Sequence, residues 1–177
     1  MAERQNHGFL YENLKIKQNN LIKSDNYTSK WDTYEVYDGV EIPVSIKCVG
    51  VNASIDFGDF KRQTEVDRDF ILYVGFWKGK KTNIVEEYKV LINKDIWNSY
   101  FGDKTIITNM NNELKDISND YSDDLKWTQY RNKYKSLYGD SIISLRFKRD
   151  HKKQKRIQCG ITKKNFITFL LNDNKIL

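Results

Sequence analysis

The spacing of apolar residues along the chain predicts helices and strands in an alternating order. Residues 9–22 place apolar side chains, Leu10 and Leu14 among them, near one helical face, which predicts an amphipathic helix. Residues 69–77 (DFILYVGFW) form a nearly continuous apolar run, as expected of a strand that is covered on both faces. Residues 83–92 (NIVEEYKVLI) alternate like a neighbouring strand, so these two segments predict the centre of a sheet.

A β-hairpin is expected between the first helix and these central strands. Residues 31–37 alternate large and polar side chains, Asp38-Gly39 is a strong two-residue turn signal, and residues 40–49 continue as a more apolar strand. Further helices are expected over residues 94–101, 123–137 and 163–171, and further strands over residues 142–148 and 156–161. The order predicts an α/β fold, with a central mixed β-sheet flanked by helices and an added C-terminal β-hairpin.

Composition is typical of one folded domain over residues 1–177, and no internal repeat or linker divides the chain. Apolar residues make up 39% and charged residues 31%, and the aromatic content of 14% argues against disorder. The 30 Lys and Arg residues against 24 Asp and Glu give a net charge of +6, a modest bias towards polyanionic partners.

Cys48 and Cys159 both lie in apolar, strand-like runs without the spacing of zinc ligands, which predicts reduced core cysteines. No stretch is long and apolar enough for a membrane span, and the first residues lack the apolar segment of a signal peptide. We therefore expect an intracellular protein without a membrane partner, cytoplasmic or nucleoid-associated, of cellular or viral origin.

The expected turn also fixes which residues face one another across the hairpin. With a two-residue loop, Asp32 lies directly across from Ser45, and Lys47 projects from the same face two residues further on. Pro43 inside the second strand lacks a ladder donor, so the alternative is a bulge there that shifts the register by one residue.

A carboxylate beside a lysine on adjacent strands suits phosphodiester hydrolysis. The carboxylate binds Mg²⁺, which polarises the phosphate and acidifies water, while the lysine orients the nucleophile or stabilises the phosphorane. The alternative is that Asp32 and Lys47 form a surface ion pair, an interaction worth about 0–1 kcal/mol. The apolar residues around Lys47 in VSIKCV favour a function, because a partly buried lysine needs a reason to be there.

The segments SKWDTYEVYDG and IPVSIKCVG resemble the PD-(D/E)xK restriction-endonuclease-like superfamily, whose core is a helix, a hairpin carrying the motif, a third strand, a helix and a further strand. Asp32 takes the first acidic position and Lys47 the lysine position. The similarity covers residues 9–100, and DFGDFKRQ followed by DFILYVGFW is also similar to small type II restriction enzymes and related viral endonucleases. The resemblance implies a homodimeric endonuclease that cleaves double-stranded DNA with Mg²⁺, or with Mn²⁺ in its place.

The sequence departs from the family pattern at Ser45, where an Asp or Glu normally supplies the second metal-binding carboxylate. Glu12 on the first helix, Glu41 on the same strand, or an acid of the DFGDF block are the alternatives. Glu41 is four residues from Ser45, roughly 13 Å along a strand, so Glu12 is preferred and Asp59 is second. The implied metal ligands are Asp32 and Glu12, and Lys47 and Ser45 complete the catalytic set.

Basic side chains cluster in residues 61–62 and in residues 146–156, and both segments suit the binding of DNA phosphates. Gln158 is a candidate for reading an adenine edge. The alternatives are a solvated charged turn that prevents edge pairing and an exposed strand residue at Gln158. The expected DNA-binding residues are Lys61, Arg62, Lys148, Arg149, Lys152, Lys153, Lys155, Arg156 and Gln158.

Two other function classes remain open from the sequence. A non-catalytic nucleic-acid-binding module that retains the nuclease fold is favoured by Ser45, and a protein-interaction module would have an incidental basic charge. The histidines, His7 and His151, lie near no Ser or Cys nucleophile pattern, which disfavours triad chemistry and a histidine-based nuclease. No P-loop or Rossmann glycine pattern is present either.

Overall fold

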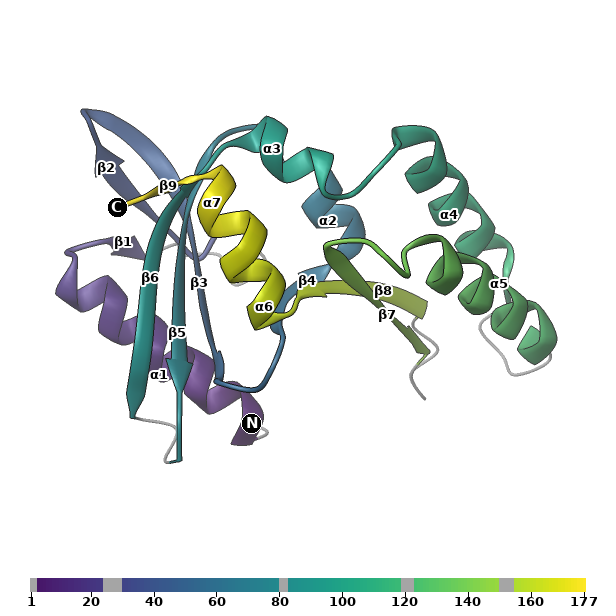
Figure 1. Ribbon diagram of the computed structural model, residues 1–177, viewed down its shortest axis with the longest axis horizontal. Coiled ribbons are helices and arrows are strands. Elements are labelled where there is room, and N and C mark those ends of the chain that lie inside the picture. The colour runs from purple at the N-terminus through teal and green to yellow at the C-terminus, as the bar shows by residue number, and fades with distance from the viewer. Residues whose placement is uncertain (1–2, 24–29, 80–82, 119–122, 150–154) are drawn as a thin grey trace.

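The computed structural model describes residues 3–23, 30–79, 83–118, 123–149 and 155–177, and these form an α/β fold with two β-sheets (Figure 1). The larger sheet is mixed, with the strand order β1-β2-β3-β5-β6-β9, and the smaller sheet is antiparallel, with the order β4-β8-β7. The strands of the larger sheet are β1 (Ile22–Lys23), β2 (Thr33–Tyr37), β3 (Val40–Gly50), β5 (Phe70–Trp77), β6 (Ile84–Ile92) and β9 (Lys175–Ile176). Those of the smaller sheet are β4 (Ile55–Asp59), β7 (Ile143–Arg149) and β8 (Lys155–Ile161).

Helices cover both sheets. The last of them is a continuous helical segment in which a π-helical turn separates two short α-helical pieces. The helices are α1 (Glu3–Gln18), α2 (Phe60–Thr64), α3 (Lys94–Ser99), α4 (Lys104–Asp116), α5 (Asp124–Leu137), α6 (Lys163–Asn165), η2 (Phe166–Leu170) and α7 (Leu171–Asp173). None of the helices in the described ranges combines the length and the apolar character that a membrane crossing needs.

The β2–β3 hairpin has the expected turn and register. Asp38 and Gly39 both have positive φ angles, 50° and 78°, as a type I′ turn requires. The pairing runs without a shift from the turn to Thr33 opposite Val44, and Pro43 pairs with Tyr34 inside it. The bulge considered at Pro43 is therefore absent, and the hairpin prediction is confirmed.

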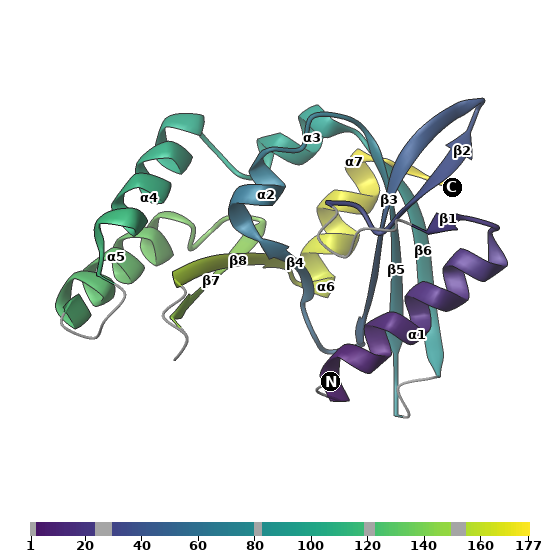
Figure 2. The same cartoon turned by 180° about the vertical axis from the view of Figure 1, so that it is seen from behind.

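The two faces of the larger sheet are covered by different helices (Figures 1 and 2). Tyr11 of α1 packs with Ile46 and Tyr73 on one face. A Cβ atom at Gly75 of β5 would lie 2.6 Å from Cζ of Tyr11, so this glycine permits the close approach of α1. On the opposite face, Phe166 of the last helical segment packs against Phe76, with ring centroids 6.1 Å apart.

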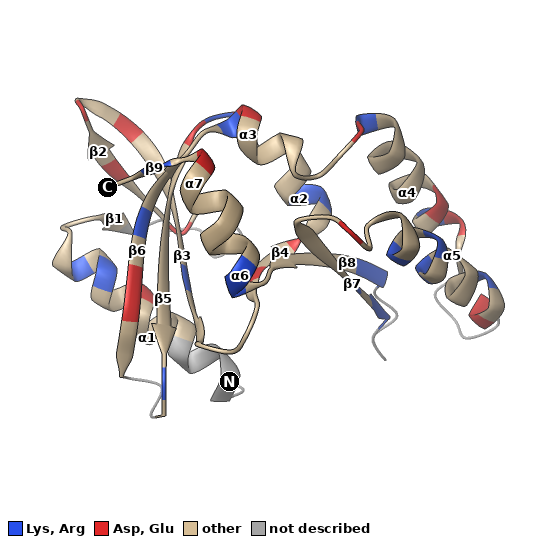
Figure 3. Cartoon of the chain, in the orientation of Figure 1, with Lys and Arg blue, Asp and Glu red and all other residues tan. Residues whose placement is uncertain are grey.

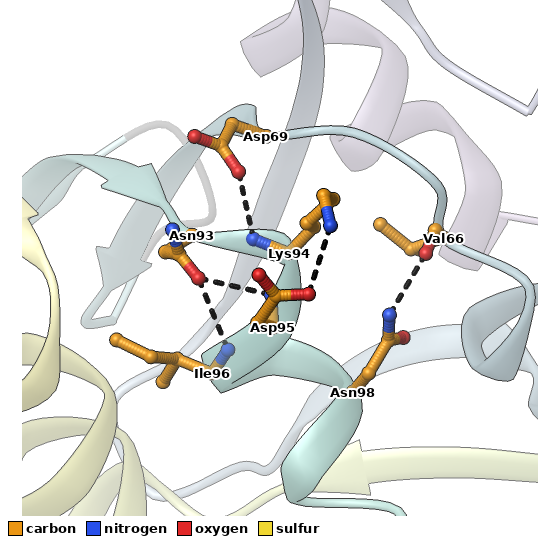
Figure 4. A network of polar contacts seen from close by, with 7 residues as sticks. All are labelled: Val66, Asp69, Asn93, Lys94, Asp95, Ile96 and Asn98. Atoms are coloured by element: carbon orange, nitrogen blue, oxygen red, sulfur yellow. Dashed lines mark hydrogen bonds and ion pairs between the residues drawn. The ribbon is translucent and has the colours of Figure 1, made fainter.

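The smaller sheet lies to one side of the larger sheet and contributes to its second core. Phe57 and Ile157 from this sheet belong to the same buried cluster as Leu72 of β5 and Trp97 of α3. The segment before β5 is tied to α3 by polar contacts (Figure 4). The carboxylate of Asp69 accepts from the backbone N–H of Lys94 at 2.9 Å, and the Asn98 amide donates to the Val66 carbonyl at 2.9 Å.

Several expectations need correction. The first helix spans Glu3–Gln18, so Ile22 belongs to β1 instead of the helix. The C-terminal hairpin β7–β8 is present, but it pairs with β4 in a separate sheet, so it is not an addition to the central one. The sequence patterns did not predict β4 or α4.

Candidate active site

Asp32 lies immediately before β2, where the hairpin and the core fix its position. Its backbone N–H donates to the Val44 carbonyl at 3.0 Å, which extends the hairpin ladder by one step. The preceding residue, Trp31, is buried against Phe70, with ring centroids 5.0 Å apart. The backbone at Asp32 is thus held on both sides.

The carboxylate of Asp32 gathers three donors from β3 on one oxygen atom. Oδ2 accepts from the backbone N–H of Ile46 at 2.6 Å and from the Ser45 hydroxyl at 3.3 Å, and it lies 3.5 Å from Nζ of Lys47. The structure therefore brings Asp32, Ser45 and Lys47 together as the sequence predicts. The Asp32 and Lys47 side chains are 28% and 25% exposed, so solvent and a ligand can reach them.

Lys30, which the sequence analysis did not single out, links this cluster to α2. Its ammonium group donates to the backbone carbonyl of Glu65, the residue that follows α2. Burial lowers the pKa of Lys30, and the nearby acids Asp67 and Glu65 act in the opposite direction. The sequence offers no periodic signal for this contact because the two residues lie on separate elements.

The structure does not bring Glu12 to this cluster. Side chains alternate along β3, so Ile46 faces α1 while Ser45 and Lys47 face the other way. Glu12 follows Tyr11 on α1, which packs on the Ile46 face of the sheet. The expected metal ligand therefore lies on a helix across the sheet from Asp32.

Among the described residues, the other acids considered in place of Ser45 make no hydrogen bond or ion pair with the Asp32 cluster. Glu41 is exposed beside the hairpin turn. Asp59 is the N-cap of α2, and its carboxylate accepts from the Arg62 backbone N–H at 3.0 Å. Within the described ranges, no three His, Cys, Asp or Glu side chains are grouped as they would be around a metal ion.

Asp32 nevertheless has the donor chemistry that Mg²⁺ uses. This ion is commonly held by one or two carboxylates, with water and substrate phosphate oxygens completing an octahedron. The three contacts of Asp32 fall on Oδ2, and Oδ1 has no hydrogen-bond partner among the described residues. A single carboxylate with one oxygen available fits a site that the substrate completes and does not fit a closed protein cage.

The face under α1 carries partly buried Tyr–Glu–Lys clusters that the sequence analysis missed. The Tyr11 hydroxyl donates to Glu87 at 2.6 Å, and Lys15 lies 2.5 Å from the same carboxylate. Burial, followed by Glu87, raises the pKa of Tyr11 well above its ordinary value. Each group is paired with another, which is typical of a structural network. A second cluster of the same composition consists of Tyr73, Glu35 and Lys89.

Two of the expected DNA-binding residues are engaged within the protein. The Arg149 side chain is only 5% exposed and lies 2.6 Å from the Asp124 carboxylate. The Lys155 ammonium donates to the carbonyls of Leu114 and Ile117, the former at 2.9 Å, and so joins β8 to the end of α4. Burial lowers the pKa of Lys155. Both side chains therefore have structural contacts that compete with phosphate binding.

The remaining expected DNA-binding residues lie on α2 and on the β7–β8 hairpin, and two of them, Lys61 and Arg156, line one groove. Lys61 and Arg62 are exposed on α2, and Lys148 is exposed opposite Arg156 on the β7–β8 hairpin. Gln158 lies within the smaller sheet, between Arg146 and Asp59. It is a strand residue, as the alternative expected, but it is half-buried and not exposed. Lys152, Lys153 and His151 lie outside the described residues.

No family model matches this sequence, and neither a curated protein nor a solved structure is similar enough to count as a match. Function is therefore argued from the site itself.

Proposed function

We propose that this protein is a metal-dependent endonuclease that hydrolyses phosphodiester bonds in double-stranded DNA. The observation that carries the proposal is the contact of Asp32 with both Ser45 and Lys47 at a solvent-accessible place on the hairpin. Mg²⁺ or Mn²⁺ bound there would polarise the scissile phosphate and acidify a water molecule. Asp32 would hold the ion, and the Ser45 hydroxyl would supply a neutral oxygen beside it.

Lys47 supplies the positive charge that phosphodiester hydrolysis needs. A preorganised cation stabilises the charge that develops on the phosphate oxygens, and this effect is strongest where water is partly excluded. The Asp32 carboxylate fixes the Lys47 ammonium at 3.5 Å, so the charge is in place before the substrate binds. Ile46 assists indirectly, because its backbone N–H at 2.6 Å orients the carboxylate.

The net charge of +6 supports DNA as the substrate, because phosphate contacts supply most of the non-specific affinity of DNA-binding proteins. A homodimer follows from the proposal, since each chain carries one candidate site and two strands have to be cut. Asp32 and Lys47 would then act once in each subunit.

The proposal is tested with a plasmid cleavage assay in Mg²⁺ or Mn²⁺, with EDTA as the metal-free control. We expect metal-dependent cleavage by the wild type and its loss in Asp32→Asn and Lys47→Ala. The matched control is Lys133→Ala, because Lys133 forms a 2.6 Å ion pair with Glu113 far from the hairpin in sequence. Cleavage that survives in both site variants contradicts the proposal.

A second candidate is a nucleic-acid-binding module without catalytic activity. The observation that favours it is the hydroxyl of Ser45 at the position of the expected second carboxylate, together with the separation of Glu12 from Asp32. This candidate predicts DNA binding that weakens steeply with salt and no cleavage in either metal. A protein-interaction module would show neither property.

A further inference from the structure

A basic groove of about 490 Å³ lies between α2, α4 and β8, outside the Asp32 cluster. We define the groove by its lining, in which five Lys or Arg residues outnumber two acids and the remaining side chains are four Thr or Asn and three Ile or Leu. Figure 3 shows Lys and Arg on α2, at the start of α4 and on β8. The basic residues of the groove are Lys61, Lys104, Lys115, Lys155 and Arg156.

One face of α4 forms a polar stripe along this groove. Lys104, Thr108, Asn111 and Lys115 are spaced by four, three and four residues, and all of them line the groove. From Lys104 to Lys115 the helix rises about 16 Å, comparable with the rise of about five nucleotides of one DNA strand. The opposite face of α4 is anchored in the core by Met110, which is fully buried.

The cations at the two ends of the stripe are available to a ligand. In the described part of the chain, neither Lys104 nor Lys115 has an ion-pair partner, and both are exposed. Lys61 makes only an exposed pair with Glu65 at 3.7 Å. Lys155 differs, because it is held by carbonyl groups of the α4 end and so shapes the groove floor. The stripe therefore presents to a polyanion the two ammonium groups of Lys104 and Lys115, with amide and hydroxyl groups between them.

The groove adjoins the candidate active site through α2. Glu65, which lines the groove, accepts a hydrogen bond through its carbonyl from Lys30, two residues before Asp32. A strand lying in the groove would therefore continue past α2 towards Asp32 and Lys47. We infer that the groove binds the phosphate backbone of the DNA duplex beside the cleavage site.

This inference rests on the proposed function, because it takes the substrate to be DNA. It assigns phosphate contacts to Lys104 and Lys115 and a shaping role to Lys155. Phosphate contacts fix the position of a duplex without reading its sequence. The two α4 lysines should therefore affect binding equally for duplexes of different sequence.

The test measures binding of a fluorescein-labelled DNA duplex of mixed sequence by fluorescence anisotropy in EDTA, over a series of NaCl concentrations. Each phosphate contact contributes about −0.9 to the slope of log affinity against log salt, so Lys104→Ala/Lys115→Ala should make this negative slope shallower by about 2. The control Lys135→Ala/Lys164→Ala removes the same charge from exposed positions outside the groove. It should retain the wild-type slope.

The outcomes separate this inference from the proposed endonuclease. If the α4 double variant binds with wild-type affinity and slope while the wild type cleaves plasmid, the groove inference is overturned and the nuclease stands. If the double variant has the shallower slope expected and the wild type cuts no DNA, the groove inference stands and the endonuclease proposal fails. The groove inference would also be overturned if millimolar inorganic phosphate displaced the duplex with equal potency from the wild type and from the double variant. Circular dichroism melting confirms that the variants are folded.

Discussion

Replacing Lys47 with methionine separates a catalytic role of the Asp32–Lys47 contact from a structural one. The two side chains are about a quarter exposed and 3.5 Å apart, so the pair belongs to the class of partly solvated ion pairs that contribute about 0–1 kcal/mol. Methionine keeps an unbranched apolar stem in place of the lysine methylenes, which preserves their packing. We therefore expect the free energy of unfolding to fall by no more than about 1 kcal/mol.

The expected loss of activity is larger. If Lys47 stabilises charge on the phosphate in the transition state, removing it should slow cleavage about 10²- to 10³-fold, by analogy with the loss of one preorganised donor. That factor corresponds to about 2.7–4 kcal/mol of transition-state stabilisation. The change in the activation barrier would thus exceed the change in stability several-fold, which a purely structural ion pair cannot produce.

Asp32 provides the internal comparison. Asp32→Ala also removes the acceptor of the Ile46 N–H, so it should destabilise the fold by about 1–3 kcal/mol. Asp32→Asn keeps an acceptor oxygen there and should cost less. Urea denaturation gives the stabilities, and cleavage rates under single-turnover conditions give the activities. A Lys47→Met variant that loses 3 kcal/mol or more of stability, or that cleaves at the wild-type rate, would refute this reasoning.

Three further predictions concern packing and titration. Gly75→Ala should destabilise the protein by about 1–3 kcal/mol in urea denaturation, because the added Cβ meets the Tyr11 ring at 2.6 Å. An equal loss of stability in a Tyr11→Ala background would contradict this cause. Lys155→Met should lower the free energy of unfolding by about 1.5–3 kcal/mol, because it removes two hydrogen bonds from an ammonium group to carbonyls at the end of α4. An unchanged denaturation midpoint would contradict this prediction. Burial raises the pKa of Cys48 to about 11, so the rate of iodoacetamide alkylation in the folded protein should keep rising above a pH of about 10, where a urea-unfolded control has levelled off.

The hairpin site could be predicted because its determinants are local. The Asp38-Gly39 turn fixes the register, and the period of two along each strand fixes the faces, so Asp32 and Lys47 meet without reference to the rest of the fold. β5 was equally predictable, since a continuous apolar run requires a strand with two covered faces. These features depend on residues that are close in the chain.

The position of α1 could not be predicted in this way. Leu10 and Leu14, expected on the buried face, are 58% and 45% exposed, whereas Tyr11 and Lys15 are buried. The reason is long-range, because both buried side chains reach Glu87 on β6. The hydrophobic pattern alone therefore selects the wrong face of α1 for packing against the sheet.

The basic groove was missed for a similar reason. The α4 sequence KTIITNMNNELKD is rich in Asn and Thr, which have weak intrinsic helix propensity. Its apolar residues Ile106, Met110 and Leu114 do recur at helical spacing, a signal that the sequence analysis did not use. Its helix is stabilised by Asp103, whose carboxylate caps the N-terminus, and by burial of Met110. The groove also needs α2 and β8, which are far from α4 in sequence, and only the folded structure brings them together.

The two faces of the larger sheet differ in a way that constrains where chemistry can occur. Under α1, each tyrosine hydroxyl and each lysine ammonium of the Tyr–Glu–Lys clusters is paired with a carboxylate. On the other face, Asp32 and Lys47 are paired but remain accessible, and α2 with its basic residues lies on that side through the Lys30 contact. A phosphodiester substrate requires an accessible anion-binding charge next to a carboxylate that can hold a metal ion. The second face also carries the basic groove, which is why the nuclease proposal and the groove inference place DNA on the same side of the sheet.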